Sequence, residues 1–121
     1  LMPDLSASAR GLFITGTDTG VGKTHIAALI LRELRAAGFR TGAYKPVCSG
    51  AVDDVTGMPC WDDLDRLQAA LRAESPDPGD PELCARERIG PQRFRAPLAP
   101  PLAARFEGKA VDLSLVDAGL T

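Results

Sequence analysis

The sequence predicts an α/β fold in which helices flank a parallel β-sheet. Three observations carry this prediction: a compact apolar run at residues 11–14, a glycine-bearing turn after it, and a helical pattern over residues 23–37. A strand followed by a helix is the first half of a crossover, and parallel strands are joined in this way. After residue 47 no run predicts a further strand with comparable clarity, so we expect the sheet to be incomplete.

The turn between the first strand and the helix predicts a phosphate-binding loop. Residues 16–24 read Gly-Thr-Asp-Thr-Gly-Val-Gly-Lys-Thr. In a loop that leads into a helix, backbone N–H groups and the positive end of the helix dipole converge on phosphate oxygens. Lys23 can then reach the outer phosphates, and the Thr24 hydroxyl can bind a magnesium ion. We therefore expect a P-loop NTPase-like fold with phosphate ligands at Thr19, Gly20, Val21, Gly22, Lys23 and Thr24.

This loop is a variant of the strict pattern, which has a glycine five residues before Gly22. That position is Thr17 here, and Gly16 stands one place earlier. The alternative is a glycine-rich turn that only connects a strand to a helix. A Gly-Lys-Thr sequence at a strand-to-helix junction favours phosphate binding over that alternative.

The predicted helix is followed by a second strand. Apolar side chains recur along the helix at helical spacing, at Ile26, Leu29, Ile30 and Leu34. Gly38 stands where the helix should end. The strand should end near Lys45, because Pro46 cannot donate to a sheet ladder. Parallel strands bind ligands at their carboxyl ends, so Lys45 and Ser49 should share an edge with the phosphate loop.

A second helix is predicted over residues 61–71, where Leu64, Leu67 and Leu71 lie on one face. Asp62 or Asp63 is the expected N-cap, since short acidic side chains accept hydrogen bonds from the first helical N–H groups.

The rest of the chain is rich in proline and glycine, and we expect it to be rich in loops. Residues 75–81 predict a loop, residues 82–87 a short helix, and residues 92–95 an extended segment. Pro101 is placed as the first residue of a helix that runs to Phe106. Ser114 is expected to begin a last helix.

Composition indicates a globular protein: 121 residues are 45% hydrophobic and 25% charged. The formal net charge of -2 offers no general attraction to nucleic acid or to an anionic membrane. Cys48, Cys60 and Cys84 form no C-x-x-C pair, so we expect reduced thiols in a cytoplasmic protein. We expect residues 1–10 to be a loose leader and residues 11–121 to be part of one domain, without a signal peptide or a membrane span.

Two motifs together resemble the dethiobiotin synthetase family. The first is the phosphate loop at residues 16–24, and the second is Tyr-Lys-Pro-Val-Cys-Ser-Gly at residues 44–50. The start of the predicted helix at Asp62 and the segment 96–104 resemble the family as well, so the similarity runs from about residue 12 to residue 120. Asp18 also favours these ligases over partitioning ATPases, which usually have a second lysine at that position.

The resemblance implies an enzyme: an ATP- and magnesium-dependent ligase in which 7,8-diaminononanoate takes up CO2 or bicarbonate as a carbamate. ATP then phosphorylates the carbamate, and the second amine closes the ring of dethiobiotin. The family also implies a homodimer and an amino-terminal half here, because its later metal-binding glutamate segment does not occur in these 121 residues.

The resemblance also assigns roles to residues. Lys23 looks like a contact to phosphates and carbamate, and Lys45 like a basic catalytic group beside the carbamate and the γ-phosphate. Thr24 and Asp63 look like magnesium ligands, with Asp62 as the fallback. Substrate contacts are expected at Thr19, Lys45 and Ser49.

Other interpretations remain for the roles of single residues and for the function of the protein. Asp63 as a plain helix cap and Lys45 as an ordinary exposed lysine are the simplest ones, and the family pattern also differs at Gly20 and Pro101. Two other functions compete with the ligase. One is a phosphate-binding half-domain without catalysis, and the other is an amidoligase of the cobyrinic acid diamide synthase type, which the motif around Lys45 disfavours.

Overall fold

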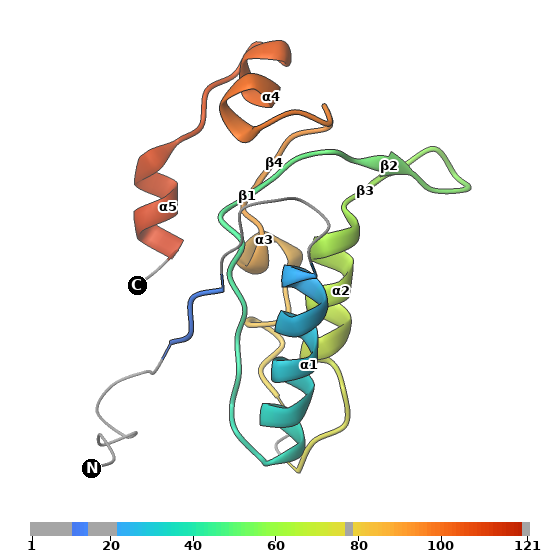
Figure 1. The fold of residues 1–121 in the computed structure, drawn as a ribbon, viewed down its shortest axis with the longest axis vertical. Coiled ribbons are helices and arrows are strands. Elements are labelled where there is room, and N and C mark those ends of the chain that lie inside the picture. Colours follow the sequence, from blue (N-terminus) through green and yellow to red (C-terminus); the bar gives the residue numbers. More distant parts are fainter. Residues whose placement is uncertain (1–10, 15–21, 77–78, 120–121) are drawn as a thin grey trace.

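The computed structural model describes residues 11–14, 22–76 and 79–119. In order, the elements are α1 (Lys23–Ala36), β1 (Val47–Cys48), β2 (Val52–Asp53), β3 (Pro59–Cys60), α2 (Asp62–Leu71), α3 (Arg86–Ile89), β4 (Gln92–Arg93), α4 (Pro100–Phe106) and α5 (Leu113–Gly119). Helices α1 and α2 pack side by side, α4 lies beyond the strands at the opposite end, and α5 lies at the left of the view (Figure 1).

A parallel strand pair is present, but it is not the predicted one. β1 pairs with β4, with Val47 opposite Gln92, and the connection between them runs through α2 and α3. The segment 11–14 is not a strand, and the Phe13 side chain is 89% exposed. That prediction was wrong in this structure because no strand of the described chain pairs with the segment, and an apolar run without a partner has no ladder to join.

The second strand was also misplaced, since the structure begins it at Val47 and not before Pro46. Lys45 N–H nevertheless donates to Ile89 C=O at 2.7 Å, so backbone pairing extends across the proline. β4 lies within the predicted extended segment 92–95, which is thereby confirmed. The α/β class is thus confirmed, with a parallel sheet that is small and incomplete.

Helix α1 begins and ends where the sequence predicts. Gly22 precedes it with a φ of 94°, a left-handed conformation that favours glycine, and accepts a hydrogen bond from Ile26 N–H at 2.9 Å. Gly38 follows it with a φ of 89° and bonds back to Arg35 C=O.

Helix α2 is confirmed as well, but neither aspartate caps it. Trp61 occupies the N-cap position without a side-chain cap bond, and Asp62 and Asp63 lie inside the first turn. The Trp61 ring is buried, and its Nε1–H donates to Phe94 C=O at 2.9 Å. The indole thus holds the start of α2 against the end of β4. The aspartates remain favourable in the first turn because it is the positive end of the helix dipole.

The later helices differ slightly from prediction. The predicted helix over 82–87 is displaced to α3, because Asp80 Oδ1 accepts from Glu82 N–H at 2.9 Å and forms a local turn first. α4 starts one residue earlier than expected, with prolines in its first two positions. α5 begins beside Ser114, whose N–H donates to the Asp112 carboxylate at 3.0 Å.

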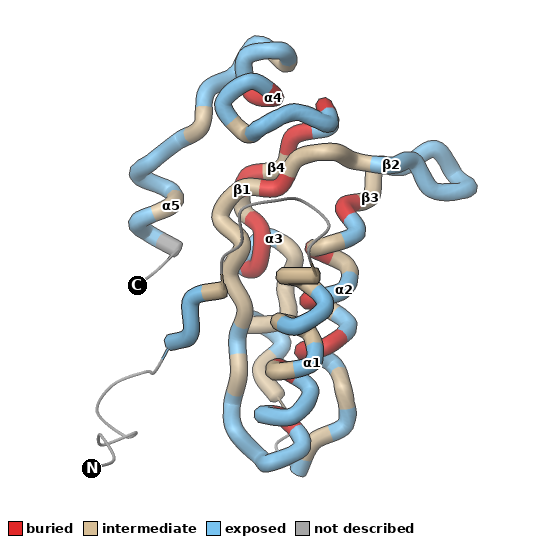
Figure 2. The backbone as a smooth tube through the Cα atoms, viewed as in Figure 1, coloured by how far each residue is buried: buried red, intermediate tan, exposed pale blue. Residues whose placement is uncertain are grey.

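The main core lies between α1, α2, α3 and β1, where the buried segments gather in Figure 2. It contains Leu31, Cys48, Trp61, Leu64, Leu67, Ala70, Leu71 and Ile89. A smaller cluster beneath α4 contains Phe94, Ala96, Ala103 and Ala104. Among the described residues, no helix is both long and apolar enough to cross a lipid bilayer.

Candidate functional site

The phosphate loop is represented by its final residues. Gly22 precedes α1, and Lys23 and Thr24 are its first two residues, both half-buried. The predicted phosphate contacts at Thr19, Gly20 and Val21 lie outside the described residues. A 14-residue helix begins at Lys23, so the N-terminal position required for binding an anion is present.

Lys45 and Asp63 form the central contact of the site. The Lys45 ammonium donates to the Asp63 carboxylate, and the two form an ion pair. Their side chains are 34% and 43% exposed, so the pair lies at the surface of the packed core and remains accessible to small molecules. The structure therefore brings together two side chains that stand 18 residues apart in the sequence.

Thr24 joins this pair from the start of α1. Partial burial pushes the pKa of Asp63 upward, but hydrogen bonds from Lys45 and Thr24, and the charges of Lys45 and Arg66, lower it below the usual value. Asp63 is therefore a carboxylate at neutral pH. A threonine hydroxyl, an aspartate and a lysine thus converge at the N-termini of two packed helices.

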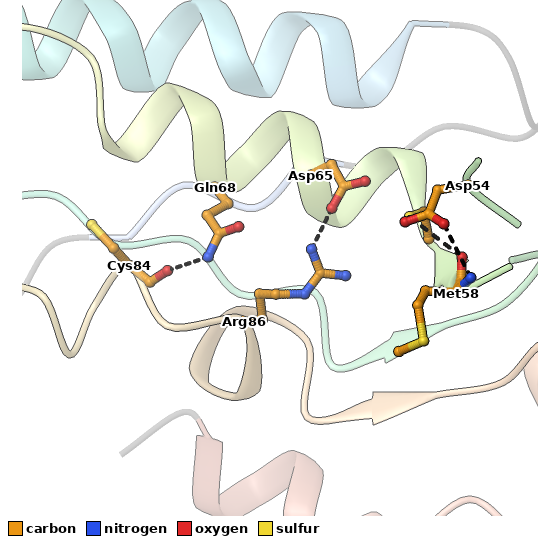
Figure 3. Close-up of polar contacts among 7 residues, drawn as sticks. Asp54, Met58, Asp65, Gln68, Cys84 and Arg86 are labelled. Carbon is orange, nitrogen blue, oxygen red and sulfur yellow. Dashed lines mark hydrogen bonds and ion pairs between the residues drawn. The ribbon is translucent and has the colours of Figure 1, made fainter. Parts of the chain in front are cut away.

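The orientation of Asp63 follows from the way α2 is held on its other side (Figure 3). Gln68 Nε2 donates to Cys84 C=O at 2.9 Å, and Arg86 pairs with Asp65 at 2.5 Å. These contacts fix the rotation of α2 about its axis. Asp62, the alternative metal ligand, pairs instead with Arg66 at 2.9 Å and its side chain is mostly exposed.

The position of Lys45 depends on its neighbours in the chain. The Tyr44 hydroxyl donates to Val116 C=O at 2.9 Å, which attaches α5 to this segment. Sequence reasoning named Tyr44 only as part of a motif, and nothing in the sequence pointed to α5 as its partner. Ser49 is half-buried just past β1, and it takes part in none of the contacts between Lys45, Asp63 and Thr24.

Cys48 belongs to the core beneath the site. Burial is the main cause that raises the pKa of its thiol, although the Lys45 charge acts in the opposite direction. Its Sγ lies 4.0 Å from Lys45 C=O. Cys48 is therefore a buried packing residue.

The basic and aromatic residues at 93–95 do not form an exposed patch. Phe94 is buried, and the Arg93 guanidinium lies 5.8 Å from the centre of the Trp61 ring. This cation–π contact uses the aromatic face that a nucleic-acid base would need.

Magnesium is the metal that the sequence motifs imply, and the donors fit it. Thr24 and Asp63 offer a hydroxyl and a carboxylate, and Mg²⁺ prefers hard oxygen ligands together with nucleotide phosphates and water. Within residues 11–14, 22–76 and 79–119, no group of three or more His, Cys, Asp and Glu side chains could hold a metal ion. Water molecules, or the phosphates of a nucleotide, and further ligands would complete the coordination.

Comparison with known proteins defines the class. A family model for an AAA domain matches residues 10–120, so the chain belongs to this family of nucleotide-binding domains.

The similar curated proteins agree on one particular enzyme. An ATP-dependent dethiobiotin synthetase BioD from Anaeromyxobacter sp. (strain K) is 46% identical over 107 residues, which are 88% of this chain and 42% of that protein. The proteins of the same name from Caulobacter vibrioides (strain NA1000 / CB15N) and Rhodopirellula baltica are 42% and 40% identical, over 86% and 89% of this chain. The chain spans about two-fifths of the length of these relatives. Its resemblance to dethiobiotin synthetase is confirmed.

Proposed function

We propose that the protein is an ATP- and magnesium-dependent cyclo-ligase that forms dethiobiotin from 7,8-diaminononanoate and CO2 in biotin biosynthesis. The observation that carries the proposal is the convergence of Lys45, Asp63 and Thr24 in a chain similar to dethiobiotin synthetases.

The proposed reaction has three balanced steps. One amine of the substrate attacks CO2 and loses a proton, which gives a carbamate. A carbamate oxygen then attacks the γ-phosphorus of ATP, and ADP leaves with the bond electrons. Finally the second amine attacks the carbamate carbon, closes the ureido ring and expels phosphate.

The side chains suit the charges of this reaction. Negative charge builds up on the carbamate and on the transferring phosphoryl group, and fixed positive groups stabilise it. In the proposed site Lys45 and Lys23 supply ammonium groups to these oxygens. Bound magnesium would supply further positive charge at the phosphates. Thr24 and Asp63 would hold the ion.

The remaining assignments follow the family resemblance. Backbone and side-chain groups of the loop would bind the phosphates, from Thr19 through Gly20, Val21 and Gly22 to Lys23 and Thr24. Thr19, Lys45 and Ser49 would contact the diamine substrate. We also propose a homodimeric, cytoplasmic enzyme, as the family resemblance implies.

Substitution of Lys45 tests the proposal in the full-length protein. Lys45→Ala should lower dethiobiotin formation by about 10²-fold or more, because one charge on the developing oxyanions is lost. Binding of ATP should stay near that of the unsubstituted protein. Dethiobiotin would be measured by mass spectrometry after incubation with the diamine, bicarbonate and ATP.

Lys109→Ala is the matched control, since Lys109 is an exposed lysine on the loop after α4. Full turnover in Lys45→Ala would remove Lys45 from the mechanism. If the unsubstituted full-length protein binds ATP and forms no dethiobiotin, the non-catalytic phosphate-binding domain or the amidoligase becomes the better assignment.

A further inference from the structure

The Asp63 carboxylate is paired with a cation that belongs to the chain itself. Lys45 donates to it and forms an ion pair with it, and the nearby Thr24 hydroxyl also helps to lower the pKa of the carboxyl. The same carboxylate and hydroxyl are the oxygens that the proposed function assigns to magnesium. One acidic group is therefore shared between an internal ammonium and an expected metal ion.

Such sharing has an electrostatic consequence. A divalent cation that binds Asp63 loses favourable interaction energy if the carboxylate is already neutralised, and it is repelled by an ammonium nearby. The pair is partly buried, so water and salt screen these effects less than on an open surface. Lys45 and the metal ion should therefore oppose each other.

We propose that Lys45 is an internal competitor of the divalent cation for Asp63, and that it thereby sets the metal affinity of the site before substrate binds. When the cation takes the carboxylate, the ammonium is released and becomes available to the carbamate. Coupling of this kind is reciprocal, so the factor by which Lys45 weakens metal binding is the factor by which the metal weakens the ion pair. The inference rests on the proposed metal site.

The two partners differ in their freedom to move. The Lys45 backbone is held by its N–H bond to Ile89 C=O and by the following proline, which restricts the residue before it. Its ammonium, however, is at the end of a flexible four-carbon stem. The ammonium can therefore leave Asp63 without any change in the sheet.

The Asp63 carboxylate is less free to move than the Lys45 ammonium, because contacts of α2 hold its backbone in place. The first turn of α2 is tied to β4 through the bond from Trp61 Nε1 to Phe94 C=O. On the same face of α2, which is turned away from Asp63, Asp65 pairs with Arg86 and Gln68 bonds to Cys84 (Figure 3). A fixed carboxylate beside a mobile ammonium is the arrangement that a competitive exchange needs.

Metal binding without nucleotide tests the inference directly. The full-length protein and its variants would be titrated with Mn²⁺ alone, and free Mn²⁺ would be followed by electron paramagnetic resonance. Lys45→Met should bind Mn²⁺ roughly tenfold more tightly than the unsubstituted protein, because the competing charge is gone. Lys45→Arg, which retains a positive charge, should stay within roughly twofold.

Two further variants make the result specific. Lys109→Met removes an exposed positive charge on the loop after α4 and should leave Mn²⁺ affinity unchanged. Asp63→Asn should abolish Mn²⁺ binding, and adding Lys45→Met should not restore it, since the shared carboxylate is absent.

Three results would overturn the inference. The first is unchanged or weaker Mn²⁺ binding in Lys45→Met, with binding still lost in Asp63→Asn; this leaves the proposed metal site standing. The second is equal tightening in Lys45→Arg. The third is equal Mn²⁺ affinity in Asp63→Asn and the unsubstituted protein, which would also remove Asp63 as a metal ligand in the proposed function. Circular dichroism would verify that each variant is folded.

Discussion

At the scale of single residues, Gly90 lies where the backbone comes close to core side chains. A Cβ atom there would lie 3.0 Å from Cys48 Sγ and 3.1 Å from Leu64 Cδ1. The φ of Gly90 is -134°, so its backbone conformation is open to other residues and the constraint is one of space. The chain can therefore pass between β1 and α2 only without a side chain.

We expect Gly90→Ala to lower the free energy of unfolding by about 1–3 kcal/mol, the usual cost of overpacking a core. Chemical denaturation would measure the change. Gly42→Ala is a matched control, because a Cβ there would meet Leu83 at an ordinary 3.5 Å. Equal stability of both variants would show that the core side chains around Gly90 can move to make room for a Cβ atom.

Cys48 gives a prediction for alkaline pH. Burial raises the pKa of its thiol above the ordinary value of 9.0, so the folded state favours the protonated form. The resulting stability is complete below pH 9 and is lost as pH rises toward the folded-state pKa. We expect the free energy of unfolding to fall above pH 9, and to fall less steeply in Cys48→Ala. Parallel denaturation series at neutral and alkaline pH would show the two slopes, and identical slopes would contradict the prediction.

At the scale of elements, α1 buries a different face from the one that its sequence suggests. The predicted stripe includes Ile26 and Leu29, which are 50% and 49% exposed. Leu31 faces the core instead, and Arg35 is buried with its Nε bonded to Ala73 C=O at 3.0 Å. α1 thus contacts α2 through a narrow face, and a second apolar face has no contact that buries it within the described part of the chain.

Two substitutions should separate these faces in the 121-residue chain. Leu31→Ala should cost about 2–4 kcal/mol of unfolding free energy, since it leaves a cavity in the core. Ile26→Ala should change stability by less than about 0.5 kcal/mol, as exposed positions usually do. Urea denaturation followed by circular dichroism would measure both. A larger loss in Ile26→Ala than in Leu31→Ala would mean that α1 packs through the other face.

At the scale of the whole molecule, the parallel sheet next to the candidate site has two strands in the described part of the chain. β1 and β4 form a two-stranded parallel pair, whereas parallel sheets are normally larger and covered on both faces. The chain spans about two-fifths of its curated relatives, and Thr24 and Asp63 are the oxygen donors that it places together.

Nucleotide affinity should reflect this partial site. We expect the 121-residue chain to bind Mg-ATP at least about tenfold more weakly than the full-length protein, a difference of ~1.4 kcal/mol, because fewer groups contact the ligand. Isothermal titration calorimetry of both proteins would measure the two affinities. Equal affinities would show that residues 1–121 hold all of the groups that bind the nucleotide.

Local signals in the sequence determined the helices and marked the candidate residues of the site. The helical pattern after Gly22, the glycine at its end and the leucines of α2 depend on residues close in the chain, and each was predicted correctly. The motif around Lys45 and the aspartates at 62 and 63 also marked the candidate residues. Local chemistry is enough for these features, because capping, turns and helical spacing act over a few residues.

Only the tertiary structure decided which strands pair and which aspartate faces Lys45. An apolar run such as residues 11–14 becomes a strand only beside a partner, and the partner of β1 is 45 residues further along the chain. Likewise Asp62 and Asp63 are adjacent in sequence but diverge by about 100° around a helix, so the packing of α2 selects Asp63. The pairing of strands and the side of a helix that faces the site depend on contacts between distant segments. No local pattern in the sequence contains that information.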